Sequence, residues 1–172
     1  MKRVLLTGMS GAGKSSVIQA LAARGYKAVD ADYGWSERGP DGDWLWREDR
    51  IQHLLSTEDS DILFLSGCAT NQGKFYPQFD HIILLSAPAA VLFERLAHRT
   101  TNTYGKTPDE LAQVRRDLET VEPLLRRGAE YEIDTCAPLE QVVESILRIV
   151  EPAERSPVPL LDGKPEEDTR CF

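Results

Sequence analysis

The stretch LLTGMSGAGKSS, residues 5–16, decides the fold. From Gly8 onward it contains a glycine, four further residues and then Gly-Lys-Ser, which completes the G-x-x-x-x-G-K-[ST] pattern of a phosphate-binding loop. An apolar run at 3–7 precedes it and a helical pattern at 14–24 follows, as this motif requires. Glycines let backbone N–H groups approach phosphate oxygens, and the start of the helix adds a partial positive charge. The stretch therefore predicts a nucleotide-binding loop between a buried strand and a helix.

The loop residues have separate expected roles. Lys14 is expected to reach the β- and γ-phosphates, and the Ser15 hydroxyl to ligate Mg²⁺. The predicted cofactors are therefore ATP and Mg²⁺. The competing interpretation, a glycine-rich turn that binds nothing, leaves the flanking strand and helix patterns unexplained. The residues expected to bind the nucleotide are Gly8, Ser10, Gly11, Ala12, Gly13, Lys14, Ser15 and Ser16.

Apolar runs alternate with amphipathic segments along the rest of the chain. The predicted strands are 3–7, 27–30, 62–66, 81–86 and 131–134. The predicted helices are 14–24, 44–56, 88–99, 108–127 and 138–150, with a kink or break at Pro123. This alternation predicts an α/β fold in three layers, a five-stranded parallel sheet with helices on both faces.

Composition limits the partners. Among 172 residues, 28 are acidic and 20 basic, and the net charge of −8 argues against binding to nucleic acid or to an anionic membrane. The cysteines, Cys68, Cys136 and Cys171, are odd in number and widely spaced, which favours reduced thiols in the cytoplasm. We expect one domain over 1–150, a Pro-rich tail over 151–172, and a monomer or homodimer.

Further motifs separate the classes of protein that share this loop. A GTPase would carry a guanine-reading N-K-x-D, and the chain has none. An AAA-type or transport ATPase would end a later strand in a Walker B acid, whereas the strand at 62–66 ends in Leu-Ser-Gly. A small kinase remains.

Two carboxylates follow the second predicted strand. Asp30 and Asp32 are two residues apart, so in an extended segment they point the same way, at the carboxyl edge of the sheet where ligands bind in such folds. One is expected to support the metal and the other to take a proton from a substrate hydroxyl. A solvated acidic turn before Gly34 is the alternative.

These motifs together resemble the adenylate-kinase-like superfamily. The phosphate loop, the D-x-D after the second strand and the Leu-Ser-Gly after the third are closest in pattern to the shikimate-kinase and gluconate-kinase branch, over about residues 2–150. The resemblance implies a P-loop NTPase sheet with strand order 2-3-1-4-5. It also implies that Asp30 supports Mg²⁺ and that Asp32 binds the acceptor hydroxyl.

The resemblance places an acceptor-binding region at about 32–56. Trp46-Arg47 is similar to the aromatic-Arg pair whose arginine grips a carboxylate in shikimate kinases, so Arg47 is a predicted substrate residue. Gly67 is the one residue kept from that family's glycine triplet and is also assigned to the substrate. Val121 stands where the family has another arginine, which argues against shikimate itself. The alternative is that the tryptophans are core and the arginines solvated.

A lid is expected at about 99–107. This run is polar and turn-rich, is followed by Pro108, and begins with Arg99, which is predicted to stabilise the transferring phosphoryl group while the lid excludes water. Lys106 is a second candidate for this role. An ordinary surface loop is the alternative.

Three functions remain open. The leading one is Mg²⁺·ATP-dependent phosphotransfer to a small hydroxylated, anionic metabolite, with Lys14, Asp32 and Arg99 as catalytic residues. A nucleoside or nucleoside-monophosphate kinase is the first alternative. A nucleotide-binding regulator or ATPase without a small-molecule acceptor is the second.

Overall fold

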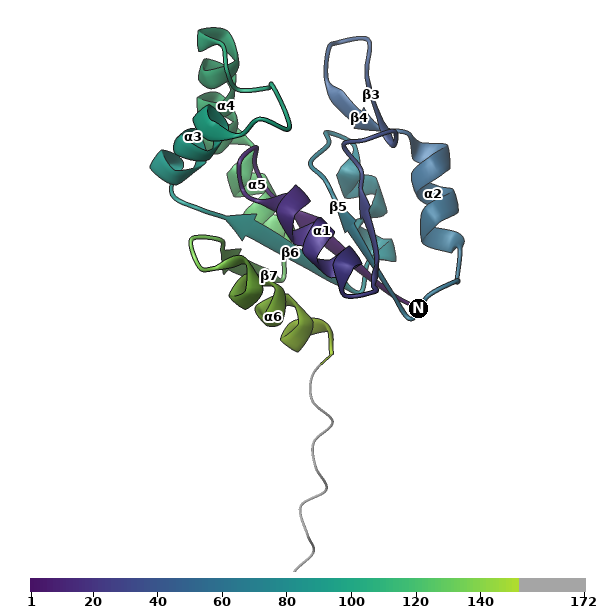
Figure 1. Ribbon diagram of the computed structural model, residues 1–172. Coiled ribbons are helices and arrows are strands. Elements are labelled where there is room, and N and C mark those ends of the chain that lie inside the picture. Colours follow the sequence, from purple (N-terminus) through teal and green to yellow (C-terminus); the bar gives the residue numbers. More distant parts are fainter. Residues whose placement is uncertain (152–172) are drawn as a thin grey trace, which may run out of the picture.

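Residues 1–151 are described by the structure, a computed structural model, and they form three layers with a β-sheet between helices (Figure 1). The predicted Pro-rich tail lies outside the described residues, apart from Glu151. In chain order the elements are β1 (Lys2–Thr7), α1 (Lys14–Ala23), β2 (Lys27–Asp30), β3 (Ser36–Arg38), β4 (Trp44–Trp46), α2 (Glu48–Ser56), β5 (Ile62–Ser66), the 3₁₀ helix η1 (Gln72–Gln78), β6 (His81–Ser86), α3 (Ala89–His98), α4 (Pro108–Thr120), α5 (Glu122–Gly128), β7 (Tyr131–Asp134) and α6 (Leu139–Val150).

The central sheet has five parallel strands in the order β2-β5-β1-β6-β7. Strands β3 and β4 form a separate two-stranded antiparallel sheet. Counted within the central sheet alone, the order is 2-3-1-4-5, as the family resemblance implied. The strands lie at the predicted ranges to within one residue. The α/β P-loop fold is thereby confirmed.

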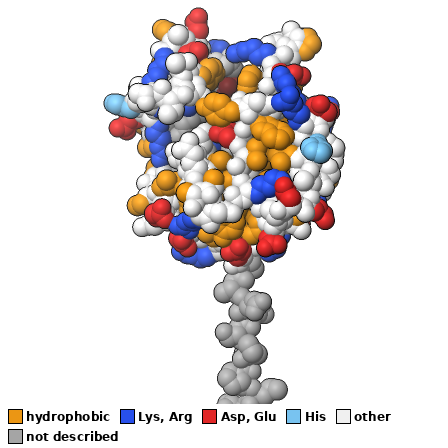
Figure 2. All heavy atoms as spheres, turned by 45° about the vertical axis from the view of Figure 1, so that its right-hand side comes forward, with side chains coloured by type: hydrophobic (Ala, Val, Ile, Leu, Met, Phe, Trp, Pro, Cys, Tyr) orange, Lys and Arg blue, Asp and Glu red, His pale blue; other side chains and the backbone are white. Residues whose placement is uncertain are grey.

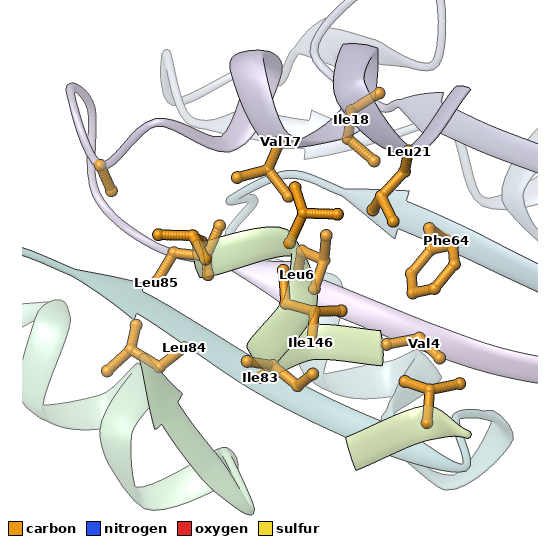
Figure 3. Packing of buried hydrophobic residues seen from close by; sticks show 14 of the residues in the cluster. Val4, Leu6, Val17, Ile18, Leu21, Phe64, Ile83, Leu84, Leu85 and Ile146 are labelled. Atoms are coloured by element: carbon orange, nitrogen blue, oxygen red, sulfur yellow. The ribbon is translucent and has the colours of Figure 1, made fainter. Parts of the chain in front are cut away.

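The core lies on both faces of the sheet because its strands are apolar throughout. On β1, Val4 and Leu6 face α1 and α6, whereas Leu5 faces the opposite side, and all three are fully buried. Figure 3 shows Val4 and Leu6 packed with Leu21 of α1 and Ile146 of α6. Each such buried side chain contributes about 1.5–3 kcal/mol.

The opposite face is covered by α2, η1 and α5. Side chains from α2 and η1 pack there on β1 and β5, and α5 lies beside η1, where Gly128 contacts the Tyr76 ring. The buried residues contributed by this layer include Ile51, Leu54, Leu55 and Phe75.

The carboxyl ends of all five strands meet at one edge of the sheet. The loop after β1 lies there, with α3 and α4 rising on one side and the β3–β4 hairpin on the other (Figure 1). Figure 2 shows this end of the molecule hollowed, with an acidic side chain inside the hollow and basic side chains on its rim. The edge is the position expected for a ligand site in an open parallel sheet.

The predicted helix over 44–56 is wrong in its first part. Gly42, with a φ of 84°, allows a tight turn in which Gly39 N–H donates to Asp43 O at 2.8 Å. The chain then returns as β4, pairing Trp46 with Ser36, and α2 begins only at Glu48. Trp44 and Trp46 therefore lie on a strand and not on the predicted helix.

The break at Pro123 is confirmed, because α4 ends at Thr120 and α5 begins at Glu122. The start of α4 is closed by a capping box in which the Thr107 hydroxyl accepts from Glu110 N–H and the Glu110 carboxylate accepts from Thr107 N–H. Within residues 1–151, no helix has both the length and the apolar character needed to cross a membrane.

Candidate nucleotide and acceptor site

The loop after β1 has a backbone that only glycine accommodates at its first position. A Cβ on Gly8 would lie 2.3 Å from the Leu85 carbonyl oxygen, which is a severe clash with backbone. Gly13 has a φ of 92° in the left-handed region and directly precedes α1. The two glycines of the motif are therefore required by the geometry, one by close packing and the other by its backbone angle.

The N-terminus of α1 is shaped to receive an anion. Its first turn contains no acidic residue and its N-cap, Gly13, provides no side-chain cap, in contrast to α2 and α4, whose first turns carry acids. Its N–H groups and helix dipole therefore remain available to phosphate. Lys14 extends back along the loop and donates from Nζ to Gly8 O at 2.7 Å and Met9 O at 3.2 Å. These features fit the phosphates of a nucleotide.

The predicted metal residues meet in the structure. Ser15 Oγ donates to Asp30 Oδ2 at 2.7 Å, joining the start of α1 to the end of β2. A hydroxyl and a carboxylate beside a phosphate loop form a donor set that suits Mg²⁺, which takes few protein ligands and completes its shell with phosphates and water. Residues 1–151 contain no cluster of three or more His, Cys, Asp or Glu side chains that would hold a metal by itself.

Asp32 lies beside this pair in a partly desolvated position. Its backbone N–H donates to Asp30 Oδ1 at 3.1 Å, and its Oδ1 accepts from Trp44 Nε1 at 3.3 Å. Burial raises the pKa of the Asp32 carboxyl, and the charge of Asp30 adds to this, whereas Lys14, the Trp44 hydrogen bond and Arg99 act in the opposite direction. The sequence analysis did not foresee Trp44 as a partner of Asp32.

Arg99 reaches the same region from the end of α3. Burial lowers the pKa of its guanidinium, while the charges of Tyr33 and Asp32 act to raise it. Arg99 therefore interacts electrostatically with Asp32, the carboxylate predicted to bind the acceptor hydroxyl. Arg99 Nη2 donates to Tyr104 O at 2.6 Å, within the predicted lid. Lys106, the other lid candidate, instead donates to Ala97 O at 2.6 Å. The structure thus brings Arg99, and not Lys106, toward the carboxylates.

Arg95 is a residue that the sequence analysis did not assign to the site. From the middle of α3 it donates to Gly11 O at 3.2 Å, to Thr135 Oγ1 at 2.9 Å and to Thr135 O at 2.6 Å. It therefore ties the phosphate loop to the loop after β7. Its spacing of four residues from Arg99, about one helical turn, was the available signal.

The predicted substrate residues Arg47 and Gly67 lie at the acceptor side. Gly67 directly follows β5, and a Cβ there would lie 3.0 Å from Trp46 Nε1. Arg47 precedes α2, and its Nε lies 3.2 Å from Glu37 Oε2 without hydrogen-bond geometry. Next to Gly67, burial raises the pKa of the Cys68 thiol, which keeps it protonated at neutral pH.

Unpartnered polar atoms gather in this region. Buried polar atoms are normally hydrogen-bonded, so each exception calls for an explanation. Within residues 1–151 the buried side-chain atoms without a partner are Trp46 Nε1, Arg47 Nε, Ser66 Oγ, Arg99 Nε and Glu122 Oε2. Ser66 ends β5, Trp46 Nε1 lies beside Gly67 directly after it, and Arg99 is the predicted lid arginine, whereas Arg47 Nε lies beside Glu37 and Glu122 is on α5. This concentration is typical of a ligand site.

A protein family described as "AAA domain" matches residues 4–116. The chain belongs to this family. The description names the AAA class, whose ATPases the sequence analysis set aside because no Walker B acid was found. In the structure β5 indeed ends at Ser66, without a carboxylate. The match covers the phosphate loop, both aspartates, the hairpin and the segment containing Arg95 and Arg99.

One relative and several structures of similar fold are kinases by name. A protein of Archaeoglobus fulgidus named "Putative adenylate kinase" is 29% identical over 158 residues, covering 86% of this chain and 81% of its own. Shikimate kinase from Bacteroides thetaiotaomicron has a TM-score of 0.68 at 22% identity, covering 87% of this chain and 98% of its own. A gluconokinase from Sinorhizobium meliloti has a TM-score of 0.58 at 22% identity, covering 85% and 89%. This chain thus shares the fold of P-loop small-molecule kinases.

Proposed function

We propose that the protein is a phosphotransferase that uses Mg²⁺·ATP to phosphorylate a small hydroxylated, anionic molecule. The observation that carries this proposal is the Ser15–Asp30 hydrogen bond beside Asp32, because a hydroxyl and a carboxylate suited to Mg²⁺ lie next to a second carboxylate at the phosphate loop. A protein that only binds the nucleotide has no need of that second carboxylate. The kinase names of the relative and of the similar folds support the same choice.

Each residue has a defined task in this proposal. The γ-phosphoryl group of Mg²⁺·ATP is the group transferred. Lys14 and the N–H groups at the start of α1 hold the phosphates, while Ser15 and Asp30 hold the metal. Asp32 orients the acceptor hydroxyl and takes the proton that this hydroxyl loses, so that phosphorylated acceptor, ADP and one proton result. Arg99 stabilises the charge that develops on the transferred group.

The charge of the acceptor is inferred from two arginines. Arg99 has a buried Nε without a hydrogen-bond partner, Arg47 Nε has only the ion pair with Glu37 at 3.2 Å, and a guanidinium binds carboxylate or phosphate through paired donors. A nucleoside monophosphate is also a small hydroxylated anion, and the relative from Archaeoglobus fulgidus favours it as the second candidate. We further propose a cytoplasmic protein, monomeric or homodimeric, that binds neither nucleic acid nor membrane.

ADP release from ATP in the presence of Mg²⁺ tests the function. The acceptors to compare are nucleoside monophosphates, sugar acids and amino alcohols. We expect one class to stimulate ADP release far above buffer, Asp32→Asn to abolish that stimulation, and Asp61→Asn, an exposed aspartate before β5, to leave it unchanged. ATP hydrolysis that no acceptor stimulates would favour the regulator or ATPase instead.

A further inference from the structure

One side chain of the β3–β4 hairpin directly contacts Asp32, the carboxylate proposed to orient the acceptor hydroxyl. Trp44 on β4 donates from its indole Nε1 to Asp32 Oδ1 at 3.3 Å. Among the described residues no other side chain donates a hydrogen bond to the Asp32 carboxylate. Trp44 Nε1 is therefore the group that selects which carboxylate oxygen is engaged by the protein and which one is left for a ligand.

Trp44 is held firmly enough to orient its partner. Its carbonyl accepts from Thr70 N–H at 2.9 Å, which fastens β4 to the segment that follows β5. Two residues on, the Asn71 side chain accepts from Trp46 N–H at 2.9 Å and donates to Trp46 O at 3.0 Å. The Asn71 contacts hold the base of the hairpin, where Trp46 pairs with Ser36, and the Thr70 contact holds Trp44 itself at the start of β4. The main chain of Trp44 is thus anchored to the segment that follows β5.

Asp32 is anchored independently on its own segment. Its N–H donates to Asp30 Oδ1, and Ser36 Oγ closes the following turn by donating to Ala31 O at 2.6 Å. Main-chain placement alone leaves the carboxylate free to rotate about its side-chain bonds. The indole N–H restricts that rotation, because it engages one of the two carboxylate oxygens of Asp32.

We propose that Trp44 is a positioning residue, which holds Asp32 Oδ1 so that Oδ2 faces the acceptor hydroxyl, and that its ring forms a wall of the acceptor site. This inference rests on the proposed phosphotransfer function. The ring is 37% exposed beside Asp32, so it offers an apolar surface to the carbon face of a bound acceptor. The N–H and the ring then have separable effects, one on turnover and the other on binding.

Substitutions at Trp44 separate these effects. Trp44→Phe keeps a ring and removes the N–H, so we expect the kcat for the acceptor to fall about tenfold, the lower range for a hydrogen bond to a charged group, while KM changes less than twofold. Trp44→Ala removes the ring as well and should also raise KM. Tyr131→Phe, which removes the polar group of an exposed aromatic ring at the start of β7, outside the acceptor region, is the control and should alter neither constant.

The contact itself is tested without any acceptor. In ¹⁵N-labelled protein the Trp44→Phe variant identifies the Trp44 indole signal, and hydrogen exchange of that N–H is then compared between the wild type and Asp32→Ala. We expect exchange to quicken by a factor of about 2–10 when the carboxylate is removed. The Trp46 indole, which is buried and does not contact Asp32, should change little.

The outcomes distinguish the two proposals. Unchanged Trp44 exchange in Asp32→Ala, or turnover of Trp44→Phe within twofold of wild type, overturns the positioning role and leaves the kinase function standing. If no acceptor is phosphorylated, the function fails, and the role of Trp44 in catalysis fails with it, whatever the exchange shows. Loss of kcat in Trp44→Phe with intact Asp32-dependent exchange supports both.

Discussion

Arg95 is predicted to hold the nucleotide site together, although it is remote in sequence from both loops that it joins. Its guanidinium makes three hydrogen bonds, one to Gly11 O and two to Thr135. Thr135 Oγ1 also donates to Ser86 O, so it keeps a partner when Arg95 is removed, but the Thr135 carbonyl loses its bond to the guanidinium. Arg95→Ala therefore removes a charged donor and leaves the carbonyl oxygen of the buried Thr135 without this partner.

The magnitude follows from these contacts. A hydrogen bond from a charged group contributes about 1.5–3 kcal/mol, and a buried acceptor left unpaired costs about 1–3 kcal/mol. Because the three bonds share one partly exposed group and are not additive, we expect a loss of about 2–4 kcal/mol in the free energy of unfolding. For a chain of this size each kcal/mol lowers Tm by about 2–4 °C, so Tm should fall by about 4–16 °C.

Two measurements check this prediction. Scanning calorimetry gives Tm, and titration calorimetry gives the affinity for ATP, which should also fall because the loop carbonyl at Gly11 is no longer held. Arg116→Ala is the matched control, since Arg116 is exposed on α4 and donates to Gln113. A Tm within 2 °C of wild type together with unchanged ATP affinity in Arg95→Ala would refute the argument.

Three further predictions concern the site. Lys14→Ala should lower ATP affinity at least about tenfold in titration calorimetry, because it removes a charge that faces the phosphates; equal affinity would exclude Lys14 from the site. Asp32→Asn should raise Tm at neutral pH. Burial raises the folded-state pKa of this carboxyl, so ionisation destabilises the native state above the unfolded pKa, and the gain should vanish on acidification below that value. Gly8→Ala should cost about 1–3 kcal/mol in chemical unfolding, because its Cβ would meet Leu85 O at 2.3 Å.

The sheet was predictable because each of its strands has a recognisable local sequence pattern. Runs such as ILFLS at 62–66 are apolar throughout, which is typical of parallel strands buried on both faces, and every residue of this run is buried. The phosphate loop was predictable for a different reason, because its spacing of glycines and lysine is set by the ligand. In both cases the information lies within a dozen neighbouring residues.

The hairpin was not predictable on those terms. Trp44–Trp46 is three residues long, and its side chains also fit the helical period of α2, which follows almost at once. What makes it a strand is contact with Thr70 and Asn71, more than twenty residues away. Arg95 was missed for the same reason, since Gly11 and Thr135 lie 84 and 40 residues from it.

The absence of a Walker B acid at the end of β5 is related to the presence of Asp30 at the end of β2. β5 lies between β1 and β2, and Ser66 is in register with both Leu6 and Asp30. Neighbouring residues in register point to the same face of a sheet, so a carboxylate at position 66 would lie beside Asp30 with the same charge. Ser66 is small and fully buried, which leaves Asp30 Oδ2 room to reach Ser15 Oγ across the edge. In the proposed function, the acid absent from β5, the strand next to β1, is Asp30, one strand further out.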